Sequence, residues 1–176
     1  MIDNVYIRQI LRCHSCPLAA VRRNVVLGRG ALERHKLLLM GEAPGRSEDT
    51  LGQAFIGTAG KLLDYMLEQA GIPIADCYFT NTVLCHPSDR LGGENREPER
   101  NEVVACMENV MYIAQLVNPM AVVLVGEIAQ RYYKRHFPLH WHITHPASIA
   151  RTGGRSSPHI LRNINILIEV RRHIWP

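Results

Sequence analysis

Four short apolar runs are spaced along this chain, and they constrain its fold more than any other feature. The first three cover residues 36–40, 77–84 and 121–125, and a weaker fourth covers residues 142–144. Short apolar runs bounded by glycine or polar residues are typical of parallel strands that are buried on both faces. The runs therefore predict a parallel sheet of about four strands.

Helical patterns separate these runs. Residues 59–70 place their leucines and methionine on one face and end at Gly71, with Pro73 just beyond, which is typical of a helix end. Further helices are expected at residues 5–11, 18–23, 99–116, 128–135 and 158–174. Because strands alternate with helices, we expect residues 1–176 to form a single α/β domain, a three-layer α/β/α sandwich around the central parallel sheet.

Ligands of such sheets bind beyond the carboxyl ends of the strands. We therefore expect the functional residues directly after residues 40, 84, 125 and 144. The loop at residues 41–60 holds two glycine-rich turns, whose bare backbone allows a ligand to approach closely. Its glycine spacing matches neither the P-loop nor the dinucleotide-binding pattern. On its own, such a loop is more often a turn than a binding site.

Composition narrows the class of protein. The 176 residues are 47% hydrophobic and 20% charged, which excludes a disordered chain. No apolar run approaches the roughly 18 residues of a membrane span, and the N-terminus lacks a signal peptide's apolar stretch, so we expect a cytoplasmic protein without a membrane partner. Arginine supplies 17 of the 20 basic residues, and its bidentate side chain favours contacts with nucleic-acid phosphates.

The cysteines point to a metal. Five cysteines in a chain without an export signal are not expected to form a disulfide framework, and two of them are spaced as Cys13-His-Ser-Cys16. Because the two cysteines of such a tight turn can bind together at a metal site, metal binding is the leading hypothesis for the N-terminal segment.

Taken together, the segments at the strand ends resemble, in order and spacing, the motifs of family 4 of the uracil-DNA glycosylases, which is the iron–sulfur family. The motifs are Gly41-Glu-Ala-Pro-Gly45, Ala54-Phe-Ile-Gly-Thr-Ala-Gly60, Thr80-Asn-Thr-Val-Leu-Cys85 and His145-Pro-Ala-Ser148, preceded by Cys13-His-Ser-Cys16-Pro-Leu-Ala19. The resemblance covers residues 8–172. It implies an α/β/α sandwich with a parallel four-stranded sheet, in agreement with the apolar periodicity.

The resemblance also implies a [4Fe-4S] cluster held by an N-terminal segment and the core through four cysteines, which would be Cys13, Cys16, Cys85 and Cys106 in this chain. The stretch between the last two is a few residues longer than is usual in the family, so Cys106 departs most from the pattern. Zinc in a four-cysteine site is the alternative. Cys77 lies within an apolar run and is expected to be an ordinary buried thiol.

The activity that the resemblance implies is excision of uracil from DNA, in which the nucleotide is flipped out and its N-glycosidic bond is hydrolysed, leaving an abasic site. His145 would donate to the uracil O2 as negative charge develops there. Asn81 would bind the O4 and N3 edge, because an amide offers a donor beside an acceptor. Phe55 would stack on the base, and the backbone around Gly41 and Ala43 would complete the pocket.

Ala43 stands where family 1 glycosylases carry an aspartate that positions the attacking water. The nearby carboxylates are Glu42 and Glu48. We expect Glu42 to position the water or to face the sugar, and Glu48 to act in the site or to order the loop. The alternative for both is a cap on the following turn.

Extrusion of a base from duplex DNA needs backbone contacts and an apolar wedge. In the loop after His145, we expect Ile149 to be the wedge and Arg151 to contact a phosphate. The expected partner is uracil-containing DNA, single- or double-stranded. Since the sequence shows no clear surface for self-association, we expect a monomer in the cytoplasm, associated with the nucleoid.

The chain departs from the family pattern before His145. Only 18 residues separate Gly126 from His145, fewer than is usual, which predicts an altered loop beside the site. Three hypotheses follow: a uracil-DNA glycosylase, a relative that acts on another modified pyrimidine, and a DNA-binding or regulatory relative without catalysis.

Overall fold

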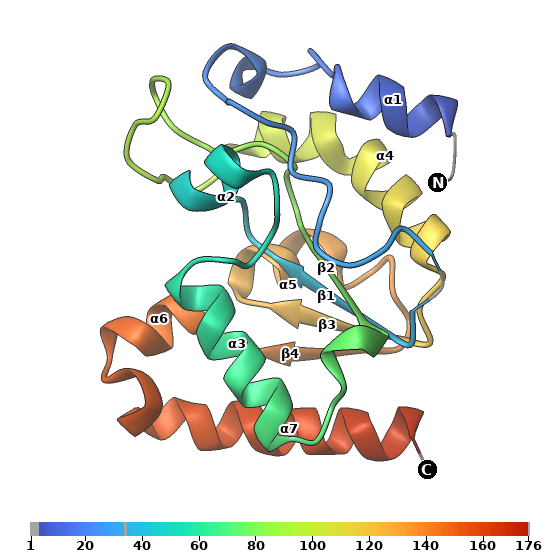
Figure 1. Ribbon diagram of the computed structural model, residues 1–176, viewed down its shortest axis with the longest axis vertical. Helices are drawn as coiled ribbons and strands as arrows, with labels where there is room; N and C mark the ends of the chain where they lie inside the picture. Colours follow the sequence, from blue (N-terminus) through green and yellow to red (C-terminus); the bar gives the residue numbers. More distant parts are fainter. Residues whose placement is uncertain (1–3, 34, 176) are drawn as a thin grey trace.

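The computed structural model describes residues 4–33 and 35–175 (Figure 1). The strands of these residues are β1 (Leu37–Gly41), β2 (Cys77–Asn81), β3 (Ala121–Val125) and β4 (His140–Ile143). The α-helices are α1 (Val5–Leu11), α2 (Arg46–Leu51), α3 (Thr58–Gln69), α4 (Arg100–Val117), α5 (Glu127–Tyr133), α6 (Pro146–Arg151) and α7 (Pro158–Ile174). Three 3-10 turns are η1 (Pro17–Ala20), η2 (Ile74–Asp76) and η3 (Gly154–Ser156).

The four strands form one parallel sheet in the order β2-β1-β3-β4. Side chains of β1 alternate between two apolar cores. Leu37 and Leu39 pack with residues of α3, α6 and α7, whereas Leu38 and Met40 pack with residues of α1, α4 and α5. Helices therefore cover both faces of the sheet, as Figure 1 shows for α3 and α7 below it and α4 above it. The predicted three-layer α/β/α architecture is confirmed.

The strand order places the site. After β1 the chain crosses to β2 on one side and later to β3 on the other, so the carboxyl end of β1 lies at the point where the winding of the sheet reverses. Open α/β sheets bind ligands in the crevice at this point. The glycine-rich loop at residues 41–60 follows β1 directly.

The segment before β1 covers the β2 edge of the sheet. Arg29 and Phe79 exchange two backbone hydrogen bonds, and Val26 N donates to Leu84 O at 2.7 Å. A covered edge removes a row of unpaired backbone groups. Earlier in the chain, α1 packs on α4 through the Tyr6 and Tyr112 rings, whose centroids are 4.3 Å apart.

Some elements differ from the sequence-based expectation. The run predicted at residues 77–84 is a strand only to Asn81, because its partner β1 ends at Gly41 and gives later residues no ladder to join. The helix predicted at 18–23 is the 3-10 turn η1. Helices α2 and α6 lie in segments expected to be loops. None of the helices in the described ranges combines the length and apolar character that crossing a membrane requires.

Candidate active site

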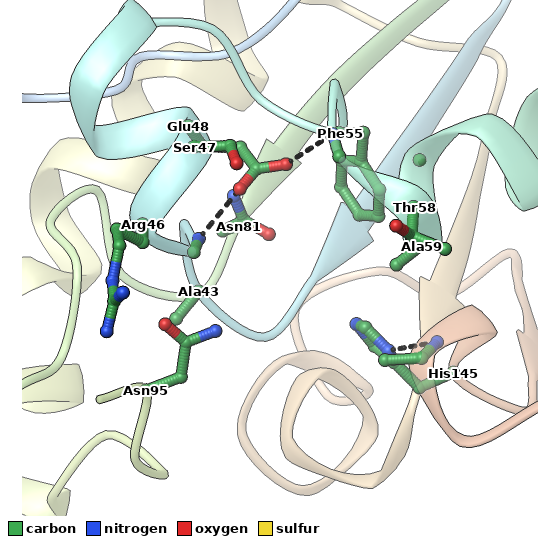
Figure 2. Close-up of a pocket in the computed structure, with 14 residues that line it drawn as sticks. Ala43, Arg46, Ser47, Glu48, Phe55, Thr58, Ala59, Asn81, Asn95 and His145 are labelled. Atoms are coloured by element: carbon green, nitrogen blue, oxygen red, sulfur yellow. Dashed lines mark hydrogen bonds between the residues drawn. The ribbon is translucent and has the colours of Figure 1, made fainter. Parts of the chain in front are cut away.

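A cavity of about 300 Å³ opens at the carboxyl ends of the strands (Figure 2). It is bounded by the loop after β1, the start of α3, the end of β2 and the start of α6. Its lining residues are Ala43, Gly45, Arg46, Ser47, Glu48, Phe55, Gly57, Thr58, Ala59, Gly60, Asn81, Asn95, His145 and Ala147. The structure thus brings together Ala43, Glu48, Phe55, Asn81 and His145, all of which the sequence had singled out.

Asn81 is the last residue of β2 and is 3% exposed. Its side-chain amide has no hydrogen-bond partner among the described residues, although it lines the cavity. Leaving such a buried group without a partner costs about 1–3 kcal/mol, so native proteins rarely do so without a ligand or water. The amide therefore offers one donor and one acceptor to a molecule bound in the cavity.

Phe55 forms the wall beside Asn81, and two glycines make room for it. A Cβ atom on Gly41 would lie 2.4 Å from Phe55 Cζ and 2.7 Å from Asn81 Oδ1. A Cβ atom on Gly60 would lie 1.8 Å from the Phe55 carbonyl oxygen. Phe55 itself has φ +54°, a left-handed conformation that is uncommon outside glycine. Its ring packs against the Phe79 ring, with the two centroids 5.9 Å apart, and also lines the cavity.

Glu48 fixes the turn that carries Phe55. One carboxylate oxygen accepts from Gly45 N at 3.1 Å, and the other accepts from Ile56 N and Gly57 N at 3.2 and 2.8 Å. Figure 2 shows this carboxylate between the start of α2 and the Phe55 turn. Of the two roles expected for Glu48, these contacts favour loop ordering.

His145 is the N-cap of α6, and its ring accepts from Ala147 N at Nδ1, 3.2 Å away. Because a backbone N–H can only donate, the proton of the neutral ring is on Nε2. Burial, assisted by the positive charge of Arg151, lowers the pKa of His145 to about 4. The ring is therefore neutral at pH 7 and presents Nε2–H as a donor. Gly126, with φ +91°, makes room for the ring, since a Cβ there would lie 2.9 Å from His145 Cβ.

A second cavity adjoins the first, since Ala43, Asn95, His145 and Ala147 line both. The residues that line only the second are Glu42, Pro44, Pro87, Arg96, Glu97 and Arg151. Burial and the neighbouring Glu97 carboxylate raise the pKa of Glu42, while Arg151 opposes this shift. The arrangement puts a carboxylate that takes up a proton more readily than usual on one side of His145 and the Asn81 amide on the other.

Four cysteines line a third, apolar cavity between α1, the segment after β2 and α4. They are Cys13, Cys16, Cys85 and Cys106. Cys77, by contrast, is buried within β2, where its thiol donates to Pro73 O. Among residues 4–33 and 35–175, no three Cys, His, Asp or Glu side chains converge on a single-ion site.

Two of these thiols accept hydrogen bonds. Asn109 Nδ2 donates to Cys13 Sγ at 3.6 Å, and Leu84 N donates to Cys106 Sγ at 3.4 Å. Burial raises the pKa of Cys106 to about 12. Cys13 behaves differently: although burial opposes ionisation, hydrogen bonds from Ser15 and Asn109 lower its pKa.

Comparison with known proteins agrees with this geometry. Residues 27–168 match the family model described as the uracil DNA glycosylase superfamily. The chain belongs to this superfamily. The chain is also 34% identical over 154 residues to a Type-4 uracil-DNA glycosylase of Archaeoglobus fulgidus, an alignment that covers 88% of this chain and 71% of the relative.

Two further relatives carry the same name. The Type-4 uracil-DNA glycosylase of Thermotoga maritima is 35% identical over 125 residues, which cover 71% of this chain and 62% of that protein. The one of Pyrobaculum aerophilum is 36% identical over 122 residues, which cover 69% of this chain and 59% of that protein. The chain thus spans about three fifths of these two relatives.

One sequence-based role is wrong for this superfamily member. Ile149 was expected to be a wedge in DNA, but its side chain is 0% exposed and packs in the core with α3 and α7. A wedge must project from the surface, whereas Ile149 lies on the inner face of α6, a helix in a segment that was expected to be a loop. Arg151, at the end of α6, is exposed beside the second cavity, where a phosphate contact is sterically possible.

Asn95 is a cavity residue that the sequence did not indicate. It lines both cavities of this glycosylase-superfamily fold, yet it lies in a polar stretch, residues 87–98, that by composition resembles any surface loop. The proline and glycine residues before Asn95 indicate a turn, but they do not indicate which way the Asn95 side chain points. Only the packing of that loop against α2 shows that Asn95 faces the site.

Proposed function

We propose that this protein removes uracil from DNA by hydrolysing the N-glycosidic bond, and leaves an abasic site. The observation that carries the proposal is the buried, unpartnered Asn81 amide in one cavity with a neutral His145 donor. The Type-4 uracil-DNA glycosylase name of the relatives supports the same activity. The substrate is single- or double-stranded DNA that contains uracil, acted on by a monomer associated with the nucleoid.

The cavity residues divide the recognition of the base among them. Phe55 stacks on the uracil ring, while the Asn81 amide donates to O4 and accepts from N3–H. The backbone around Gly41 and Ala43 closes the pocket. This pairing of a donor with an acceptor matches O4 and N3–H of the uracil edge.

His145 acts on the leaving base. As the glycosidic bond breaks, its electron pair goes to N1 of uracil, and the negative charge spreads to O2. The Nε2–H of His145 donates to this oxygen, and a neutral donor suffices because the charge is stabilised without proton transfer from the ring. His145→Ala should therefore slow single-turnover cleavage about 100- to 1000-fold, the effect of removing one such donor.

Glu42 completes the reaction at the sugar. Its carboxylate orients a water molecule toward C1′ and stabilises the positive charge that develops on the sugar as the base leaves. The water oxygen bonds to C1′, and the proton that it loses is accepted by the carboxylate or passes to the departed base. Glu42→Gln, which keeps the side chain's size, should fold normally and cleave slowly; an unchanged rate would remove Glu42 from the mechanism.

A [4Fe-4S] cluster fits the four-cysteine cavity, and Cys13, Cys16, Cys85 and Cys106 would hold it. Thiolates are the usual ligands of such clusters, and each iron takes one of them. Zinc in a four-cysteine site is the alternative. When bound, the cluster supplies a structural crosslink between the N-terminal segment and the core. Anaerobically purified protein that is colourless and contains zinc would decide for zinc.

Arg151 contacts a DNA phosphate at the mouth of the second cavity. Arg151→Ala should weaken binding to a uracil-containing oligonucleotide and should reduce the slope of log affinity against log salt concentration by about 1, because one phosphate contact is lost. Binding that does not change with salt would contradict the contact. The rate of cleavage at saturating protein should stay close to the wild-type rate.

The experiment that tests the activity uses matched oligonucleotides. Purified protein is incubated with single- and double-stranded DNA that holds uracil, or another modified pyrimidine, at one position, and alkali then cleaves abasic sites. Strand cleavage at uracil, lost in His145→Ala, supports the proposal. Cleavage at another base alone, or binding without cleavage, overturns it.

A further inference from the structure

His86 is a buried group that the proposed chemistry leaves unused. It directly follows Cys85, is 0% exposed, and its Nε2 lies 2.8 Å from Asn95 Oδ1. Since an amide oxygen can only accept, Nε2 carries the proton and donates. The other ring nitrogen, Nδ1, is buried without a hydrogen-bond partner in the part of the chain that the structure describes. The ring is therefore held in place at an energetic cost, which its hydrogen bond to Asn95 partly offsets.

Asn95 itself is exposed and stands where the two cavities meet. With its oxygen occupied by His86, the amide must direct its NH2 group the other way. The position of Nδ2 agrees, since a Cβ atom on Gly45 in the cavity wall would lie 3.3 Å from it. No described residue accepts a hydrogen bond from this NH2 group. The site therefore holds a second unsatisfied donor, on the rim opposite His145 (Figure 2).

The loop around Asn95 is anchored by other contacts. Arg96 N donates to Pro87 O, and the Arg96 guanidinium pairs with the buried Glu102 carboxylate at 2.7 and 2.9 Å. These contacts fix the chain directly after Asn95 and leave the rotation of its amide open. The contact from His86 decides which end of the amide faces the cavities.

We propose that His86 is a positioning residue: it orients Asn95 so that the side-chain NH2 donates to an oxygen atom of the bound uracil nucleotide. The inference rests on the proposed function. Because His86 follows Cys85, the same short segment contributes to the cysteine cavity and, one residue later, sets a donor of the substrate site.

The test is a double-mutant cycle measured by single-turnover cleavage of a uracil-containing oligonucleotide. H86L, which keeps the bulk and removes the donor, should be about tenfold slower, the effect of about one hydrogen bond. H86Q, whose amide N–H reaches a similar position, should recover most of the rate. In an N95A background H86L should change the rate less than twofold, because the group through which His86 acts is gone. N95D still accepts from His86 but has no donor, and should be as slow as N95A.

Two controls separate positioning from folding. Ser88→Ala alters a buried side chain of the same loop, bonded to Arg90 O, and should leave the rate unchanged. The visible absorbance per protein should be equal in H86L and wild type. Equal slowing by H86L with and without Asn95, or loss of absorbance in step with rate, would overturn the proposal.

A crystal structure of H86L gives a readout without turnover: Asn95 should leave its wild-type orientation, whereas an unmoved amide overturns the proposal even if the wild-type protein cleaves uracil. If the wild-type protein cleaves no uracil, the proposed function fails separately.

Discussion

At the residue scale, the protonation state of His145 determines how the site responds to pH. Burial, followed by the charge of Arg151, lowers its pKa to about 4, so the ring stays neutral from pH 8 down to about pH 5. A histidine that acts as a cation would gain activity as the pH falls through about 6.5. A neutral donor predicts no such gain.

Protonation of Glu42 predicts a loss of activity at acidic pH. Burial and Glu97 raise its pKa, so the carboxylate takes up its proton at a higher pH than an ordinary glutamate does and loses its function as the pH falls. Single-turnover rates measured from pH 8 to pH 4.5 should be flat near pH 6.5 and should fall at the acidic end. In Glu42→Gln the acidic fall should disappear. A rate that rises between pH 7 and pH 6 would contradict a neutral His145.

Gly41 permits β1 to lie close to Phe55 and Asn81, the two residues proposed to bind the base. In Gly41→Ala, the new methyl group would overlap Phe55 Cζ, at 2.4 Å, and crowd Asn81 Oδ1. Overpacking of this kind costs about 1–3 kcal/mol, and here it displaces two side chains that face the cavity. We expect at least tenfold weaker kcat/KM on uracil DNA with unchanged visible absorbance. Wild-type kinetics would show that neither side chain binds the base.

The position of some residues at the cavity can be predicted from sequence, whereas the direction of others cannot. His145, Asn81 and Phe55 follow strand ends or a glycine-rich turn, and parallel topology gathers such positions at one edge of the sheet. Ile149 shows the limit. An apolar residue in a presumed loop fits a wedge, but once the segment is helical its direction is set by the helix face, which turned it into the core.

At the element scale, α2 and the Phe55 turn are held together by one carboxylate. Glu48→Ala removes the acceptor of three backbone N–H groups, and we expect it to lower the free energy of unfolding by about 2 kcal/mol and to slow cleavage. Glu48→Gln, which keeps one acceptor oxygen, should lie between. Denaturant unfolding and single-turnover rates measure the two effects.

Glu94→Ala is the matched control for Glu48. Glu94 is an exposed carboxylate nearby whose ion pair with Arg46 lies on the surface, and such pairs contribute little. Its loss should change neither stability nor rate. If Glu48→Ala were as stable as wild type yet inactive, Glu48 would act on the substrate instead of ordering the loop.

The long helix α7 was predictable, whereas the six-residue helices α2 and α6 were not. Helix α7 was predicted with its observed bounds because its apolar positions repeat over seventeen residues. Helices α2 and α6 have six residues each, less than two turns, so periodicity carries no signal. Each of them begins at a local cap: Glu48 accepts from Gly45 N at α2, and His145 accepts from Ala147 N at α6.

At the scale of the whole molecule, the segment after β2 joins the two functional regions. Asn81 ends the strand in the substrate cavity, Thr82 Oγ1 donates to Glu42 O, and Leu84 N donates to Cys106 Sγ before Cys85 joins the cysteine cavity. A few consecutive residues thus connect Asn81, Glu42 and the four cysteines. The spacing of motifs predicted these neighbours, while the direction of each side chain came from the fold.

The cysteine cavity is also where the N-terminal segment meets the core, which leads to the last prediction. Cys13 and Cys16 lie on that segment, whereas Cys106 lies on α4. A cluster bound by all four would stabilise this attachment, because its binding free energy is available only to the folded protein. In Cys106→Ser, we expect lower visible absorbance, a lower Tm, and faster trypsin cleavage at the exposed Arg12.

Cys77→Ser changes a cysteine outside the cavity and should keep the full absorbance. If Cys77→Ser lost the absorbance and Cys106→Ser kept it, the ligand set would be wrong; if both kept it with Arg12 protected, the segment would be held by the Tyr6 and Tyr112 packing alone.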